Sequence, residues 1–189
     1  MRLERMNGWQ DPRFEALWEL YEASFPAYEN RTLPDQKRAM EDERYHVDLI
    51  YEEDQWQGFV MYWQAPGYLY VEHFAVFPCG RGKGYGSKVL TALKEKGQPV
   101  LLEIDPPEEE ISIRRKGFYE RNGFCENPYD YQHIPYKKDD VPHPLVVMTW
   151  PEPISEEVYQ GFRRFMRDVV MEYSEAKENN NWENILKFD

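Results

Sequence analysis

Cysteine is scarce in this chain, and long apolar runs do not occur in it. Among its 189 residues only Cys79 and Cys125 are cysteines, and neither stands in a metal-ligand spacing. This usage requires no oxidising compartment and predicts no metal site. No window approaches the roughly 20 apolar residues of a membrane span, and the N-terminus has no signal-peptide type of apolar stretch. We therefore predict a cytoplasmic protein without membrane partners.

Positive charge is also in short supply. The chain has 35 acidic and 23 basic residues, which gives a formal net charge of -12. Such a surface repels nucleic acid and anionic membranes, so small cationic substrates are the better match. A hydrophobic content of 41%, with 16% aromatic residues, nevertheless predicts a folded globule of one domain.

The most informative stretch joins a strand-like run, a glycine-rich loop and a helix-like run. Residues 70–77 are mostly β-branched or aromatic, Pro78 ends the run, and glycines follow at positions 80, 82, 84 and 86. Apolar residues then recur at helical spacing up to Gly97. Unpaired amides and the positive end of a helix dipole would point the same way here. We interpret the stretch as a phosphate-binding loop.

Glycine spacing distinguishes this loop from two common nucleotide-binding loops. A P-loop requires Gly-Lys at an offset that no glycine here provides. A dinucleotide site requires a third glycine where this chain has Tyr85 or Ser87, although Glu103 lies about 20 residues further on, where a ribose-binding acid is expected. A nucleotide-binding oxidoreductase is therefore only a third hypothesis.

The remaining patterns predict a mixed α/β fold with helices on both faces of one sheet. A helix between the strands at 69–76 and 99–105 favours a parallel, right-handed crossover. We expect one domain over 1–150 and a C-terminal helical extension over 151–189 packed on it. The other expected strands are 1–8, 46–53, 57–64, 129–136 and 144–150. The expected helices start at Asp11-Pro12, Pro34 and Tyr85, and two more are expected to have Ser112 and Ser155 as N-caps. The helix after Ser155 is expected to be long, with an apolar face from Val158 to Tyr173.

Two motifs give the chain a family resemblance. Residues 81–86 read R-G-K-G-Y-G and match R-x-x-G-x-G after a strand, and residues 118–124 read F-Y-E-R-N-G-F and match F-Y-x-x-x-G-F downstream. With this pair of motifs the chain resembles the GNAT superfamily of acyl-CoA-dependent N-acyltransferases. The resemblance covers about 1–150 and says nothing about the C-terminal helix.

The resemblance implies a mostly antiparallel sheet that is splayed between the strands at 69–76 and 99–105, with acetyl-CoA bound in that cleft as acyl donor. It implies that loop amides hold the pyrophosphate. Five basic residues between 81 and 96, against one acid, agree with this, although a solvated helix face is the alternative. The predicted cofactor-binding residues are Phe74, Ala75, Val76, Arg81, Gly82, Lys83, Gly84, Tyr85, Gly86, Ser87, Ser112 and Arg115.

Acyl transfer to an amine also requires a base. An alkylamine has a pKa of about 10.4, so deprotonating it near neutral pH costs on the order of 4–5 kcal/mol. Glu72 and Glu103 stand in apolar strands and are the candidate catalytic bases, with Glu72 preferred; the alternative for each is a structural salt bridge. Strict alternation would place Glu72 on the face of Phe74 and turn His73, another candidate base, away from it.

The remaining site predictions concern the leaving group and the acceptor. Tyr119 is the candidate catalytic acid toward the departing thiolate, and a backbone N–H near Val76, at a bulge, is the candidate oxyanion donor. We interpret Cys79 as a passive loop thiol rather than a nucleophile. The acceptor pocket is expected near Phe25, Glu29, Tyr129, Tyr131 and Tyr136.

These observations predict an N-acetyltransferase that moves an acetyl group from acetyl-CoA to a primary amine of a small molecule or peptide by direct transfer. The alternative is a non-catalytic acyl-CoA-binding sensor or interaction module, with the C-terminal helix docking a partner. A homodimer is compatible with either hypothesis, and nucleic acid is not expected as a partner.

Overall fold

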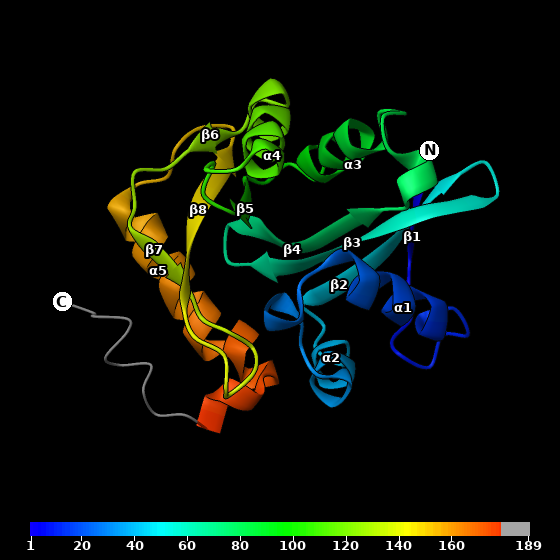
Figure 1. Cartoon of the computed structure of the whole chain (residues 1–189), viewed down its shortest axis with the longest axis horizontal. Coiled ribbons are helices and arrows are strands. Elements are labelled where there is room, and N and C mark those ends of the chain that lie inside the picture. Colours follow the sequence, from blue (N-terminus) through cyan, green and yellow to red (C-terminus); the bar gives the residue numbers. More distant parts are fainter. Residues whose placement is uncertain (179–189) are drawn as a thin grey trace.

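In the computed structural model, which describes residues 1–178, eight strands form one open sheet (Figure 1). The strand order is β1-β2-β3-β4-β5-β8-β6, and β7 pairs with β8 beside this path. All pairs are antiparallel except β4 with β5. The predicted mixed, mostly antiparallel sheet is confirmed. The strands are β1 (Arg2–Arg5), β2 (Tyr45–Glu52), β3 (Gln55–Ala65), β4 (Tyr68–Val76), β5 (Val100–Ile104), β6 (Cys125–Glu126), β7 (Tyr131–His133) and β8 (His143–Trp150).

The parallel strands β4 and β5 stay together over a short distance only. Their register pairs 69–71 with 100–102, and the second half of β4 has no partner on β5. The helix α3 (Tyr85–Lys94) makes the crossover between them, as the sequence predicted. The sheet is therefore splayed at the place that the resemblance implied, and a cleft opens where the two strands separate.

Helices cover both faces of the sheet. Figure 1 shows α3 and α4 (Glu110–Arg121) on one face and α1 (Phe14–Ser24) and α2 (Leu33–Ala39) on the other. Each face has its own apolar cluster, one with the buried side of α3 and the other with the buried side of α1. The C-terminal helix α5 (Glu156–Asp168) joins the α1 cluster through Phe162, Phe165 and Met166.

The long C-terminal helix predicted from Ser155 is shorter than expected. Ser155 does cap α5, since its hydroxyl accepts a hydrogen bond from the amide of Val158 at 3.4 Å. The helix ends before Val169, whose φ of −122° leaves the helical region, and a 3₁₀ turn, Val170–Tyr173, follows. Val158 is 39% exposed and does not belong to the core face. Residues 179–189 of the predicted extension lie outside the described residues.

Three other predicted boundaries also move. The second helix ends at Ala39 rather than near residue 44, and the strand predicted over 129–136 is reduced to β7. Ser112 does not cap α4. Glu109 is the N-cap residue. Ser112 is the third residue of the helix, and the side chain of each of these two residues accepts a hydrogen bond from the backbone amide of the other, which forms a capping box.

A β-bulge in β4 changes which side chains face which side. The register on β3 passes directly from Val71 to His73, so Glu72 has no partner there. The extra residue shifts the alternation. The prediction that Glu72 shares a face with Phe74 while His73 points away is therefore wrong. Glu72 and His73 both contact residues of the α1 face, and Phe74 packs on the α3 face.

Candidate active site

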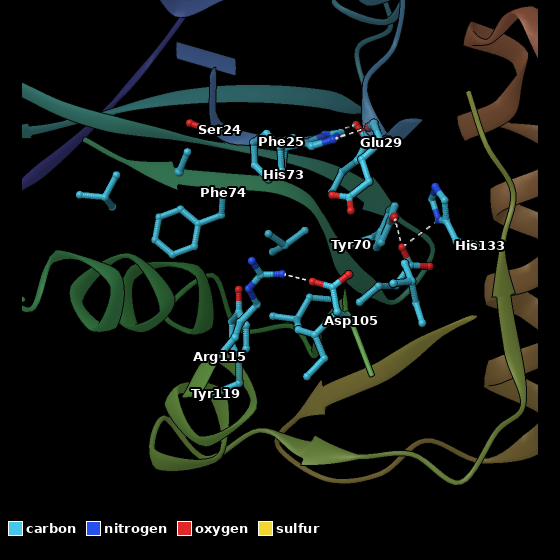
Figure 2. A pocket seen from close by; sticks show the side chains of 18 of the residues that line it. Ser24, Phe25, Glu29, Tyr70, His73, Phe74, Asp105, Arg115, Tyr119 and His133 are labelled. Atoms are coloured by element: carbon cyan, nitrogen blue, oxygen red, sulfur yellow. Dashed lines mark hydrogen bonds and ion pairs between the residues drawn. The ribbon is translucent and has the colours of Figure 1, made fainter. Parts of the chain in front are cut away.

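A cavity of about 260 Å³ lies where β4 and β5 separate (Figure 2). Its walls come from β4, β5, α4, the segment after α1, and the chain around β7. It brings together many of the predicted site residues, which are Glu72, Phe74, Ala75, Val76, Arg81, Glu103, Arg115 and Tyr119. Three of the predicted acceptor residues, Phe25, Glu29 and Tyr136, line it as well.

The glycine loop lies beside this cavity and exposes its backbone. Gly82 and Gly84 have φ values of 77° and 79°, in the left-handed region that favours glycine. Helix α3 begins directly after them at Tyr85, whose side chain is buried. The amides of 84–87 have no backbone acceptor within residues 1–178. Free amides at a helix start form an anion site, in which Tyr85 would take part through its backbone.

Close packing holds the loop helix against α4. A Cβ atom added to Gly86 would lie 2.8 Å from Cζ of Phe118, so any side chain at position 86 would require the Phe118 ring to shift. Phe118 belongs to the F-Y-E-R-N-G-F motif. The two sequence motifs therefore meet in space.

Some of the basic residues near the loop already have a partner within the protein, whereas others are exposed and could contact a bound anion. Lys88 lies 3.4 Å from Glu52, and Lys94 donates a hydrogen bond to the backbone oxygen of Asn122 while burial lowers its pKa. Arg81 and Lys83 are exposed and form no ion pair within residues 1–178. Arg81 and Lys83 are therefore the more accessible candidates for the predicted phosphate contacts.

Glu72 is held by an arginine that sequence patterns did not reveal. Arg31 binds both carboxylate oxygens, with N–O distances of 2.6 and 2.7 Å, and the Tyr136 hydroxyl donates to Oε1 at 2.7 Å. Both partners of the ion pair are almost fully buried. Burial opposes ionisation of Glu72, but Arg31 outweighs it and holds the pKa of the carboxyl well below its ordinary value. A carboxylate engaged in this way is a poor proton acceptor.

Glu103 has a different environment. Its side chain is 6% exposed, the Tyr70 hydroxyl donates to Oε2 at 2.8 Å, and Nδ1 of His133 lies 3.2 Å from the same oxygen (Figure 2). The other oxygen, Oε1, is buried and has no hydrogen-bond partner in the described part of the chain. Oε1 is therefore not open to the cavity, and the buried Tyr131 hydroxyl lies near the same carboxylate: burial and then the charge of Glu103 raise the pKa of Tyr131.

Tyr119 lines the cavity from α4. Burial raises the pKa of its phenol to about 12, and a smaller effect of Arg115 opposes this. The hydroxyl therefore stays protonated near neutral pH. It has no hydrogen-bond partner among residues 1–178, so its proton is available to a bound group.

Several other predicted site residues lie outside the cavity wall. The Ser112 hydroxyl is used in the capping box, at 3.0 Å from both the Glu109 amide and carbonyl. Tyr129 stacks on α5, Tyr131 packs against that helix too, and Cys79 is exposed beside the loop. The remaining cofactor candidates outside the wall are Gly82, Lys83, Gly84, Tyr85, Gly86 and Ser87, which form the loop beside it.

His73, the other candidate base, lies against aromatic rings. Its ring contacts Tyr21 and Phe25 edge to face, and Nε2 is 3.1 Å from the backbone oxygen of Glu29. It lines the cavity as a packed residue that fixes the segment after α1.

Sequence reasoning missed Arg31, Tyr70 and His133. A charged glutamate in an apolar strand requires a buried cationic or hydrogen-bonding partner. This requirement was the only signal in the sequence for a residue such as Arg31, and it did not say which residue the partner is. Arg31 lies in a loop between two helical turns, where no periodic spacing of residues marks a buried side chain. His133 reaches Glu103 only because β7 folds back along β8, which no local pattern predicts.

The fold and the cavity agree with the acyltransferase class that the two motifs predict. A family model described as Acetyltransferase (GNAT) family matches residues 14–124. The chain therefore belongs to the GNAT family of acetyltransferases. The predicted family and fold are confirmed, and the match ends before β7, β8 and α5.

Individual proteins support the same assignment. A solved structure from Bacteroides thetaiotaomicron, described as a GNAT-family acetyltransferase, is 32% identical with a TM-score of 0.84, covering 90% of this chain and 98% of that chain. YjbC of Bacillus subtilis, described as an acetyltransferase, is 29% identical over 79 residues, which are 41% of each protein. A Bacillus subtilis acetyltransferase solved in complex with CoA shares the fold with a TM-score of 0.53 at 15% sequence identity. The match covers 78% of this chain and 97% of that chain. None of these three descriptions names an acceptor.

Among residues 1–178, no helix is both long enough and apolar enough to cross a membrane.

Proposed function

We propose that this protein transfers the acetyl group of acetyl-CoA directly to a primary amine of a small molecule or peptide. The observation that carries the proposal is the cavity between the separating strands, which has the carboxylate of Glu103 in its wall and the free amides of the glycine loop beside it. The complex of a fold relative with CoA supports the choice of acyl donor. Cytoplasmic location remains a prediction.

Glu103 is our candidate for the base, in place of Glu72. An incoming ammonium group can give its proton to the Glu103 carboxylate through water, while Tyr70 and His133 hold Oε2. Glu72 has no free oxygen to offer, because Arg31 and Tyr136 occupy both. The neutral amine then attacks the thioester carbon and displaces the thiolate of CoA.

Tyr119 is our candidate for the acid that protonates the departing thiolate. Figure 2 shows it beside Arg115, on the wall of the cavity opposite Glu29. A protonated phenol can donate to sulfur without prior ionisation of the enzyme. The backbone near Val76 remains the candidate oxyanion donor, although the observed bulge lies at Glu72.

A thiol-release assay over a panel of primary amines tests the proposal. We expect acetyl-CoA-dependent turnover, and Glu103→Gln should lower kcat by about a hundredfold or more. Glu157→Gln, an exposed change on α5, is the control and should behave as the unaltered protein.

Two outcomes would overturn the proposal. Binding of acetyl-CoA without turnover of any amine would favour a non-catalytic sensor. Thermal stabilisation by NAD but not by acetyl-CoA would favour an oxidoreductase.

A further inference from the structure

Three side chains surround the carboxylate of Glu103, and they differ in whether they can take up a proton. The Tyr70 hydroxyl donates to Oε2 at 2.8 Å, and Nδ1 of His133 lies 3.2 Å from the same oxygen (Figure 2). The Tyr131 hydroxyl also lies near this carboxylate. Burial and then the charge of Glu103 raise the pKa of both phenols, so each remains a hydrogen-bond donor near neutral pH. An imidazole is the one kind of side chain among the three that takes up and releases protons in that range.

The surroundings of the His133 ring indicate which nitrogen carries its proton. Nδ1 is buried, and its one ion-pair contact within residues 1–178 is with Glu103. A carboxylate only accepts hydrogen bonds, so this neighbour favours a proton on Nδ1 and a lone pair on Nε2. The ring is not aligned for a full hydrogen bond, which is common in catalytic sites without substrate. Nε2 has no hydrogen-bond partner among residues 1–178.

The position of Glu103 calls for a proton carrier. Its Oε1 is buried and closed to the cavity, and its Oε2 is already contacted by Tyr70 and His133. His133 lines the same cavity from β7, with one ring nitrogen at the carboxylate and the other without a partner. An imidazole arranged in this way can accept a proton on one nitrogen and release one from the other.

We infer that His133 carries the proton of the acceptor amine to Glu103. The water beside the ammonium group gives a proton to Nε2 and takes one from the ammonium, while Nδ1 releases its own proton to the Glu103 carboxylate. The ring stays neutral, with its proton moved from Nδ1 to Nε2. After the product leaves, Glu103 returns the proton to Nδ1 and Nε2 releases one to solvent, which restores the starting state. The inference rests on the proposed acetyl transfer and adds the route of the proton.

Two substitutions of His133 separate proton transfer from simple support of Glu103. His133→Gln keeps an N–H group that can hold the carboxylate but has no basic nitrogen, and His133→Ala leaves a space that a small ring can enter. Both variants should lower kcat for a primary amine by about a hundredfold, which is a typical contribution of general acid–base catalysis. His46→Ala, which removes a histidine of β2 outside the cavity wall, is the control and should keep the activity of the unaltered protein.

Imidazole added to the assay gives a second readout. The acetylated amine is measured as the product, because free imidazole can itself release thiol from acetyl-CoA. Imidazole should raise the activity of His133→Ala about tenfold or more and leave His133→Gln and His46→Ala unchanged. Pyrazole has a ring of the same size but is a much weaker base, so it should restore no activity. Equal restoration by the two rings would mean that the ring only fills space, and this result would overturn the inference.

A measurement on the unaltered protein does not depend on the folding of any variant. NMR of the histidine ring nitrogens should find the proton of the neutral His133 ring on Nδ1, and a proton on Nε2 would overturn the inference. Activity in His133→Gln close to that of the unaltered protein would also overturn it, since His133 would then only hold Glu103, and acetyl transfer would stay in place. Absence of turnover with every amine in the unaltered protein would overturn the proposed function and this inference with it.

Discussion

Replacing Glu72 by glutamine tests whether its carboxylate supports the fold or carries out the chemistry. The side chains of Glu72 and Arg31 are 1% and 0% exposed, and the two N–O contacts are 2.6 and 2.7 Å. Glutamine keeps the shape of the side chain and removes its charge. The variant therefore leaves the Arg31 guanidinium buried without its counter-ion.

The expected loss of stability is large. Removing one partner of a buried ion pair costs about 3–5 kcal/mol, because the remaining charge stays desolvated and uncompensated. Arg31 also donates to the backbone oxygens of Val170 and Tyr173, so it cannot move to solvent without breaking these contacts. Arg31→Met should be similarly destabilising, since it leaves Glu72 charged and buried. The double variant should lose less than the sum of the two single losses, by about 1–3 kcal/mol.

Urea unfolding of the four proteins measures these values, and thiol release at a temperature where each is folded measures activity. We expect a lower midpoint at an unchanged m-value for each single variant. If Glu72→Gln lost less than about 1 kcal/mol of unfolding free energy and yet lost turnover by about a hundredfold, the structural role would be refuted and Glu72 would be the base.

Three further predictions concern the cofactor side and the C-terminal segment. Tyr119→Phe should lower kcat about tenfold without changing the shape of the pH–rate profile, because a phenol with a pKa of about 12 does not titrate in the working range. Gly84→Ala and Gly97→Ala should each cost about 1 kcal/mol in urea unfolding, since both residues have φ near 80° (79° and 78°), but only Gly84→Ala should weaken acetyl-CoA binding by calorimetry. A hydrogen bond from Arg44 lowers the pKa of Asp42 from 3.8 to about 2, so its contribution to stability is complete above pH 3.8 and is lost as the pH falls through 2. The stability difference between the unaltered protein and Asp42→Asn should therefore shrink as the pH falls from 3.8 toward 2, and a difference that stayed the same over that interval would contradict this assignment.

The loop and helix that form the proposed cofactor half of the site could be predicted from the sequence because they are local. The glycines that free the loop amides, the strand before them and the helix after them are contiguous, and the second motif supplies Phe118, on which Gly86 packs. Glu103 was found for a related reason, as an acid at the end of an apolar strand. Each of these features depends on short-range order, which periodicity and turn residues report.

The role of Glu72 could not be predicted in the same way. Its partner Arg31 lies 41 residues earlier, in a loop without periodicity, so no pattern joined the two. The bulge at Glu72 also reverses the faces of the residues after it, and a bulge leaves no mark in a run of apolar residues. Two glutamates that look equivalent in the sequence therefore differ in their partners: an arginine guanidinium binds Glu72, whereas a tyrosine hydroxyl and an imidazole bind Glu103.

The segment beyond the family match explains why the motifs identify the cofactor but not the acceptor. The match ends at residue 124, yet His133 and Tyr136, which contact the two glutamates, come after it. Helix α5 holds β7 in place, since Tyr159 stacks on Tyr129 at 3.9 Å and Phe162 packs on Tyr131 at 5.5 Å between ring centroids. The 3₁₀ turn after α5 accepts two hydrogen bonds from Arg31. We therefore expect changes in this segment to alter the proposed acceptor side and to leave the glycine loop, the proposed phosphate site, unchanged.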